Sequence, residues 1–183
     1  MSKTILNKEG NKFNVIIAKN GLLRDIMMEK TLVNYLKDLI PILKKEINPH
    51  NIFQKNEDEV LTYLLNIQKE HEFFIALINE KVIGGTVLEK KDESIRGDHK
   101  VWKLKHFALS EDIEKNTEKE IISEIENRLK KKSKSLKIQV NLSEKETRAI
   151  ELFKRNNYKK EATLDNHYRI NEKMFIYAKS INS

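Results

Sequence analysis

Five histidines and no cysteine set the range of side-chain chemistry in this 183-residue chain. Without cysteine there is no thiol nucleophile, no disulfide and no cysteine zinc site. A pair of histidines three or four residues apart on a helix is a common metal-binding pattern. No such pair occurs among His50, His71, His99, His106 and His167. We therefore expect no metal site, and the histidines are candidates for proton transfer.

His106 is the best candidate for a general base. It stands near the end of a predicted strand, residues 99–109, whose alternation puts Trp102, Leu104, His106 and Ala108 on one face. An imidazole has an unperturbed pKa of about 6.5, which suits the acceptance of a proton at neutral pH. The alternative is that His106 has a structural role, as a half-buried histidine on a strand whose imidazole is hydrogen-bonded to a neighbouring side chain.

Tyr168 is a second candidate for proton transfer. It follows His167 on a predicted late strand, and its hydroxyl could act as a general acid. A structural aromatic side chain is the alternative interpretation.

The chain carries a net charge of +7, with 35 Lys and Arg against 28 Asp and Glu. A basic balance suggests a polyanionic partner. Only six of these cations are Arg, however, and the chain is also rich in Ile and Asn, so we favour a coding bias spread over the surface. The lysine run at 130–134 is interpreted as the solvated end of a helix, with nucleic-acid binding as the alternative.

The first residues contain no apolar signal segment, and no run of 18 apolar residues could cross a membrane. Together with the absence of cysteine, this predicts a cytoplasmic protein without a membrane partner.

Hydrophobic periodicity predicts an α/β fold with one mixed, mostly antiparallel sheet. About seven strands are expected, at 13–19, 72–78, 82–88, 99–109, 136–142, 158–170 and 173–181. About four helices are expected, at 22–40, 56–70, 117–130 and 143–156. Asn20-Gly21 closes the first strand, Pro41 ends or kinks the first helix, Pro49 and His50 lie in a loop, and residues 90–98 form a charged loop. Two capping boxes, Thr117 with Glu120 and Ser143 with Glu146, open the last two helices.

This order of elements resembles the GNAT superfamily of acyl-CoA-dependent N-acetyltransferases over nearly the whole chain. One stretch that carries the resemblance is residues 102–129, where a strand, a loop and a helix follow one another. In the family, the loop reads R/Q-x-x-G-x-G/A and binds the diphosphate of CoA. Residues 113–118 take its place, but the arginine and both glycines are missing and two glutamates are present. The alternative is a capped helix with no phosphate at its start.

The second stretch is ETRAIELFKRNNY at 146–158. Ala149, Leu152 and Tyr158 fit the family's alanine, leucine and phenylalanine. Phe153 occupies the position of a tyrosine that in many members protonates the departing thiolate, and it has no hydroxyl to do so.

The resemblance implies one GNAT-like domain over residues 1–183, with a splayed parallel pair of strands in the middle of the sheet. It implies that acetyl-CoA is the cosubstrate, held by the backbone at 107–109 and across the cleft at 139–141. The implied cofactor-binding residues are Phe107, Ala108, Leu109, Ile113, Glu114, Lys115, Asn116, Thr117, Glu118, Asn141 and Lys154. Lys154 and Arg155 are the candidates for the CoA 3′-phosphate.

The sequence leaves three functions open. The first is an N-acyltransferase that moves an acetyl group from acetyl-CoA to an unidentified amine on a small molecule or a peptide. The second is an inactive GNAT-like binding or regulatory module, which the missing loop residues would suit. The third is a basic nucleic-acid-binding protein, supported by charge alone. A homodimer is also left open.

Overall fold

The computed structural model describes residues 2–6, 12–18, 26–47, 51–167 and 169–182. Five predictions fall partly or wholly outside these residues: the end of the first strand at residue 19, the Asn20-Gly21 turn, the start of the first helix, the Pro49–His50 loop and Tyr168 in the late strand. The chain divides into two compact units. Unit 1 comprises residues 1–88 and 106–113, and unit 2 comprises residues 89–105 and 114–183.

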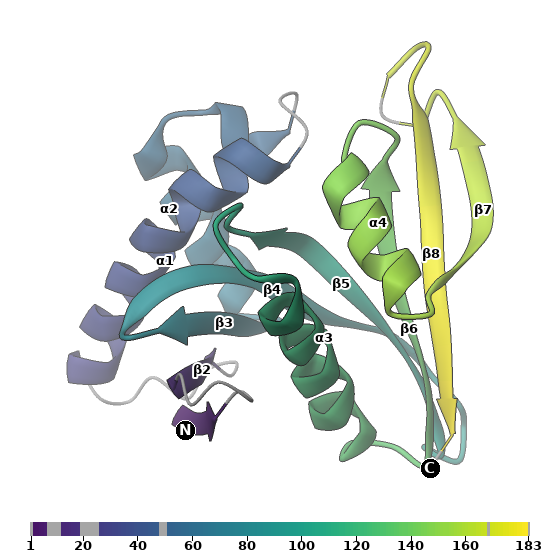
Figure 1. Cartoon of the computed structure of the whole chain (residues 1–183), viewed down its shortest axis with the longest axis horizontal. Helices are drawn as coiled ribbons and strands as arrows, with labels where there is room; N and C mark the ends of the chain where they lie inside the picture. The colour runs from purple at the N-terminus through teal and green to yellow at the C-terminus, as the bar shows by residue number, and fades with distance from the viewer. Residues whose placement is uncertain (1, 7–11, 19–25, 48–50, 168, 183) are drawn as a thin grey trace. The chain divides into compact units, whose positions relative to one another are not determined.

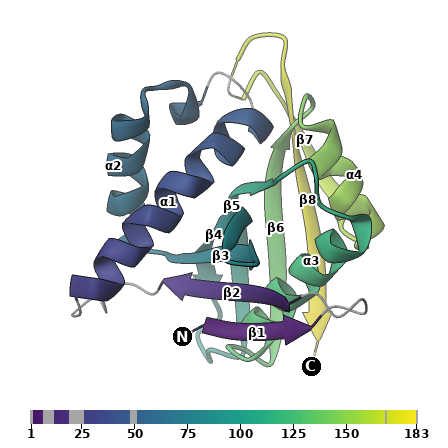
Figure 2. The ribbon, with the colours of Figure 1, turned by 60° about the vertical axis from the view of Figure 1, so that its left-hand side comes forward.

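Unit 1 contains the helices α1 (Ile26–Glu46) and α2 (Glu57–Gln68) and a short 3-10 helix, η1 (Ile52–Gln54). Its complete strands are β1 (Ser2–Leu6), β2 (Lys12–Ala18) and β3 (Glu72–Ile78), and it holds the first part of β4 (Lys81–Glu93). β1, β2 and β3 pair antiparallel in sequence order, and β1 lies beside β2 in Figure 2.

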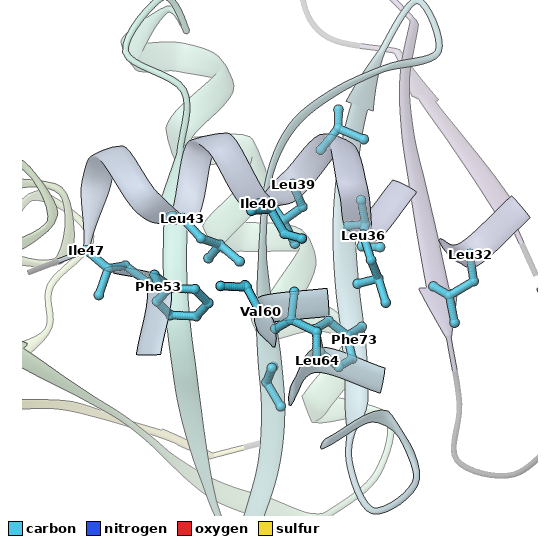
Figure 3. Close-up of a cluster of buried hydrophobic side chains, with 14 of the residues drawn as sticks. Leu32, Leu36, Leu39, Ile40, Leu43, Ile47, Phe53, Val60, Leu64 and Phe73 are labelled. Atoms are coloured by element: carbon cyan, nitrogen blue, oxygen red, sulfur yellow. The ribbon is translucent and has the colours of Figure 1, made fainter. Parts of the chain in front are cut away.

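The core of unit 1 is an apolar cluster between the two helices and the strands (Figure 3). α1 and the residue that follows it contribute a stripe at helical spacing, formed by Leu32, Leu36, Leu39, Ile40, Leu43 and Ile47. Phe53, Val60, Leu64 and Phe73 pack against it. Phe53, Val60 and Leu64 are completely buried.

Unit 2 contains the helices α3 (Lys115–Lys130) and α4 (Thr147–Arg155). Its strands are β6 (Ser135–Ser143), β7 (Lys159–Asp165) and β8 (Lys173–Asn182), with the first part of β5 (His99–Leu109). β5 and β6 are parallel, whereas β8 pairs antiparallel with both β6 and β7 (Figure 1). The hydrogen-bonding order of the sheet is β1-β2-β3-β4-β5-β6-β8-β7.

The predicted α/β class, the mixed sheet with one parallel pair and the four α-helices are confirmed. In the part of the chain that the structure describes, the sheet has eight strands rather than about seven, because Ser2–Leu6 forms an edge strand that pairs with β2. Five residues with only two apolar side chains give too weak an alternation to be recognised in sequence.

Pro41 does not end its helix, which continues to Glu46. Proline removes one backbone donor and favours a helix end. Here the proline is exposed, and the residues beyond it continue the stripe that buries Leu43 and Ile47. Burial of these two side chains outweighs the loss of one hydrogen bond.

Several further boundaries differ from the prediction, and β7 ends at Asp165 rather than near residue 170. β4 runs to Glu93, so residues 90–93 of the expected charged loop at 90–98 are strand and the loop covers only 94–98. α3 begins at Lys115 rather than at a Thr117 capping box, and Thr117 is buried within its first turn. The other capping box is half formed, since the Ser143 N–H donates to the Glu146 carboxylate at 2.6 Å, and α4 starts after Glu146.

Candidate functional site

His106 departs from the regular strand that the sequence predicts. Its φ is +55°, a left-handed conformation that is uncommon for a residue with a side chain. The burial alternation of β5 holds at Trp102 and Leu104 and then breaks, so that Phe107, Ala108 and Leu109 are all buried. The prediction that His106 and Ala108 continue the face of Trp102 and Leu104 is therefore wrong beyond Leu104. A single residue with positive φ shifts the strand register by one.

Tyr63 is the hydrogen-bond partner of His106. Its Oη lies 2.8 Å from His106 Nε2, and both side chains are half-buried. Tyr63 projects from α2, so the bond joins a helix to the end of β5 within unit 1. The rings of Tyr63 and Phe53 also meet the imidazole edge-on, with centroids 5.6 and 4.9 Å away. Two aromatic contacts and one hydrogen bond thus fix the imidazole orientation.

Gly84 allows the end of β5 to approach β4 closely. A Cβ at Gly84 would come within 2.5 Å of the Ala108 carbonyl oxygen and 2.9 Å of the Leu109 Cα. The Ser110 N–H donates to the Ile83 carbonyl at 2.8 Å and fastens the strand just after this point. The backbone of Ala108 and Leu109 is therefore fastened against β4 just after His106.

The register between β5 and β6 ends shortly before His106. It runs from His99↔Ser135 to Leu104↔Val140. β6 continues its pairing with β8 as far as Ser143↔Met174, and Asn141 lies opposite Ile176 in that pairing. Asn141 is half-buried.

The residues predicted to hold the CoA diphosphate surround the start of α3. Ile113 precedes the helix, Glu114 is its N-cap without a side-chain cap, and Lys115, Asn116, Thr117 and Glu118 form its first turn. The first N–H groups of an α-helix have no acceptor within the helix. Lys115, Asn116 and Thr117 therefore present backbone donors at the end where the helix dipole favours an anion.

Glu118 points away from this helix end and into an ion cluster. Its carboxylate is 4% exposed and accepts two hydrogen bonds of 2.8 Å, from Arg148 Nη2 on one oxygen and Arg155 Nη2 on the other. The arginines are seven residues apart on α4, a spacing that puts both on one helix face. Two guanidinium groups neutralise one carboxylate, so Glu118 adds no unpaired negative charge to the start of α3.

Lys154 and Phe153 lie at the end of α4. Lys154 is exposed and forms an ion pair of 3.1 Å with Glu151, whose hydrogen bond raises the pKa of its ammonium group. Phe153 is completely buried and meets the Tyr158 ring edge-on at 4.9 Å. A hydroxyl at position 153 would be enclosed in the core.

Sequence reasoning missed Tyr63 and Arg148. Tyr63 is 43 residues from His106, and only the packing of α2 brings the two side chains together. Arg148 carried a usable signal, since its spacing from Arg155 predicts one basic helix face. Within the described residues, no group of three His, Asp or Glu could hold a metal ion. No helix in the described ranges is long and apolar enough to cross a membrane.

The fold matches solved structures of acetyltransferases. An N-acetyltransferase from Staphylococcus aureus Mu50 has a TM-score of 0.62 at 14% identity, over 91% of this chain and 96% of that one. A probable acetyltransferase from Staphylococcus epidermidis has a TM-score of 0.64 at 13% identity, over 93% and 99% of the two chains. The ribosomal-protein-S5-alanine acetyltransferase from Vibrio fischeri has a TM-score of 0.64 at 11% identity, over 99% and 97%. No protein-family model and no curated protein sequence matches the chain. The chain has the fold of the GNAT acetyltransferases.

Proposed function

We propose that this protein is an acyl-CoA-dependent N-acyltransferase that moves an acetyl group to an amine. The observation that carries the proposal is the His106–Tyr63 pair at the end of β5, in a chain with the fold of GNAT acetyltransferases. A histidine held in a left-handed conformation costs about 1 kcal/mol or more relative to a regular strand. Such local strain is concentrated at functional sites.

His106 acts in this proposal as the general base. An amine attacks a carbonyl only as the free base, and its nitrogen must lose a proton as the N–C bond forms. The imidazole accepts that proton. Tyr63 is a positioning residue, because its hydrogen bond to Nε2 and its ring fix the orientation of the imidazole.

Acetyl-CoA would supply the acyl group as a thioester. The residues present fit its phosphates, because the first turn of α3 offers backbone donors and Arg148 and Arg155 neutralise Glu118. Glu114 and Lys115 would lie at the diphosphate, and Lys154 would lie at the 3′-phosphate. The backbone of Phe107, Ala108 and Leu109 would hold the pantetheine arm, with Asn141 as a further contact.

Protonation of the departing thiolate needs an acid other than Phe153, which has no hydroxyl and is buried. Tyr168 remains the proposed acid, although it lies outside the described residues. A cytoplasmic location, one domain over residues 1–183 and a homodimer stay predictions from the sequence.

A transfer assay tests the proposal. The purified protein is incubated with acetyl-CoA and a panel of amines, and free thiol release is recorded. The panel includes small amines, lysine peptides and a peptide with an N-terminal alanine, because the Vibrio fischeri protein with this fold is titled a ribosomal-protein-S5-alanine acetyltransferase.

The matched variant is His106→Asn. Asparagine tolerates a left-handed backbone, so this variant keeps the local conformation while removing the imidazole. We expect a loss in kcat of about 100-fold or more, in the range of general-base catalysis. A chain that binds acetyl-CoA but acetylates no amine would favour the inactive binding module instead.

A further inference from the structure

A shallow basic hollow lies on unit 2, and none of the residues assigned to acyl transfer lines it. It has a volume of about 500 Å³ and is lined by the turn between β4 and β5 and by the loop after α3. Its charged side chains are Arg96, Lys130, Lys131, Lys134 and Asp98. Four cations against one carboxylate give the hollow a formal charge of +3.

The two walls of the hollow are fastened to each other. The Ser135 N–H donates to the Asp98 carbonyl at 2.9 Å, and the Ser133 hydroxyl lies 3.0 Å from the same oxygen. Gly97, with φ of +69°, forms the turn that carries Arg96. The backbone that presents the cations is therefore preorganised, and a ligand would not have to bring the walls together.

The lysines of the run at 130–134 have different environments. Lys132 turns away from the hollow, with its ammonium group 4.7 Å from the centre of the Trp102 ring. Lys130, Lys131 and Lys134 line the hollow. Within the described ranges, Arg96, Lys130 and Lys131 have no ion pair with a carboxylate, whereas many other cations do, such as Lys100, Lys137 and Lys179.

Helix stability explains only part of this arrangement. Lys130 and its neighbour Lys131 lie at the C-terminus of α3, where cations interact favourably with the helix dipole. Arg96 belongs to the β4–β5 turn and gains nothing from that dipole. Asp98, the one carboxylate, accepts a hydrogen bond of 2.6 Å from the Ser94 hydroxyl, which lowers its pKa and keeps it ionised.

We propose that this hollow binds the phosphate groups of a nucleic acid strand. A concave surface lined by one sign of charge focuses its field and attracts counterions of the opposite sign. No aromatic residue lines the hollow, so bases have no stacking platform there. The contact is therefore with the backbone phosphates and tolerates any sequence. It is a site separate from acyl transfer and does not depend on it.

Fluorescence anisotropy with a labelled 20-base-pair DNA duplex, at 50 to 200 mM NaCl, tests this proposal. The variant Arg96→Gln/Lys130→Gln/Lys131→Gln removes three charges from the hollow. The control Lys81→Gln/Lys159→Gln/Lys173→Gln removes three charges from exposed lysines elsewhere. Both variants are first checked for a wild-type circular dichroism spectrum, and each single variant is measured if the triple variant does not fold.

We expect salt-dependent binding by the wild-type protein. Each phosphate contact contributes about 0.9 to the slope of log K against log salt, so the hollow variant should reduce that slope by about 3. The control should keep the wild-type slope. The proposal is wrong if the duplex does not bind at 50 mM NaCl or if both variants weaken binding equally. Binding of poly-glutamate in preference to the duplex would also contradict it, because the hollow would then be a site for an acidic protein.

Discussion

The Tyr63 hydroxyl lies 2.8 Å from His106 Nε2, and this bond holds an imidazole whose own backbone is in a left-handed conformation. A helix residue and a strand residue thus define one polar pair in an otherwise aromatic setting, beside Phe53. If the pair serves catalysis, removal of the hydroxyl alone should impair the chemical step.

Tyr63→Phe should lower kcat about 10-fold and leave the KM for acetyl-CoA unchanged, because the imidazole loses its partner but stays in place. The ring contacts with Phe53 and His106 remain in this variant. Steady-state kinetics with the best amine of the panel measure both constants. If Tyr63→Phe and Tyr63→Leu lower kcat by the same factor and lower Tm by the same amount, the role of Tyr63 is purely structural.

Gly84→Ala should disrupt the end of β5. The new methyl group would meet the Ala108 carbonyl oxygen at 2.5 Å, so the strand must move away. We expect a loss of about 2 kcal/mol in the free energy of unfolding, as for other overpacked positions. Gly97→Asn is the control, because a Cβ there would meet only the flexible Glu93 side chain, at 3.4 Å, and Asn tolerates the φ of +69°. Urea unfolding should give a lower free energy of unfolding for Gly84→Ala than for Gly97→Asn. Equal free energies for the two variants would contradict the close approach of β5 to Gly84.

Glu118 should be coupled energetically to both arginines of α4. Replacement of a buried carboxylate leaves two guanidinium groups without their partner, so Glu118→Gln should cost about 3 kcal/mol. A double-mutant cycle with Arg155→Gln should give a coupling energy of about 1 kcal/mol or more. Arg128→Gln, on α3 outside the cluster, supplies the comparison for loss of an arginine. Additive effects of Glu118 and Arg155 would mean that their bond contributes little.

Glu172 should make stability depend on pH in the acid range. Its carboxylate is 5% exposed, and burial alone would raise its pKa. Hydrogen bonds from the Ser143 hydroxyl and Lys145, with the charge of Arg169, outweigh burial and lower the pKa. A lowered folded-state pKa stabilises the fold above the unfolded pKa, and this stability is lost as the pH falls through the folded value.

Glu172→Gln should therefore lose about 2 kcal/mol at pH 7. The loss should become smaller as the pH falls below the ordinary glutamate pKa of about 4.3, because the wild-type protein then loses the stability that its ionised carboxylate contributes. Urea unfolding at pH 7 and at pH 3.5 gives the two differences. The same deficit at both values would show that the charge of Glu172 is not what stabilises the fold.

The sequence predicted the elements of the fold better than the geometry of the site. β5 has the predicted bounds, and α2 begins after Asn56, whose side chain accepts from the Glu59 N–H at 2.9 Å. Such features depend on local alternation and capping, which a sequence displays directly. The continuation of α1 past Pro41 depends on the burial of Leu43 and Ile47, which is a property of tertiary packing.

The geometry of the site also depends on tertiary packing, which local residue patterns do not report. His106 was identified by its type and its place near a strand end, but neither its left-handed backbone nor Tyr63 follows from residue patterns. The glutamate at 118 looked like an obstacle to phosphate binding. Its neutralisation by Arg148 and Arg155 requires the first turn of α3 to meet α4 within unit 2, which no spacing in the sequence reports.

Binding of acetyl-CoA tests the central claim most directly. The thermal unfolding of the purified protein is followed while acetyl-CoA is added from micromolar to millimolar concentrations, with CoA and pantetheine titrated in parallel. A ligand at 100 times its dissociation constant stabilises the folded state by about 2.7 kcal/mol. The proposal predicts a saturable rise in Tm with acetyl-CoA and a smaller one with pantetheine, which lacks the phosphates. No rise with acetyl-CoA at millimolar concentration would contradict an acyl-CoA-dependent function.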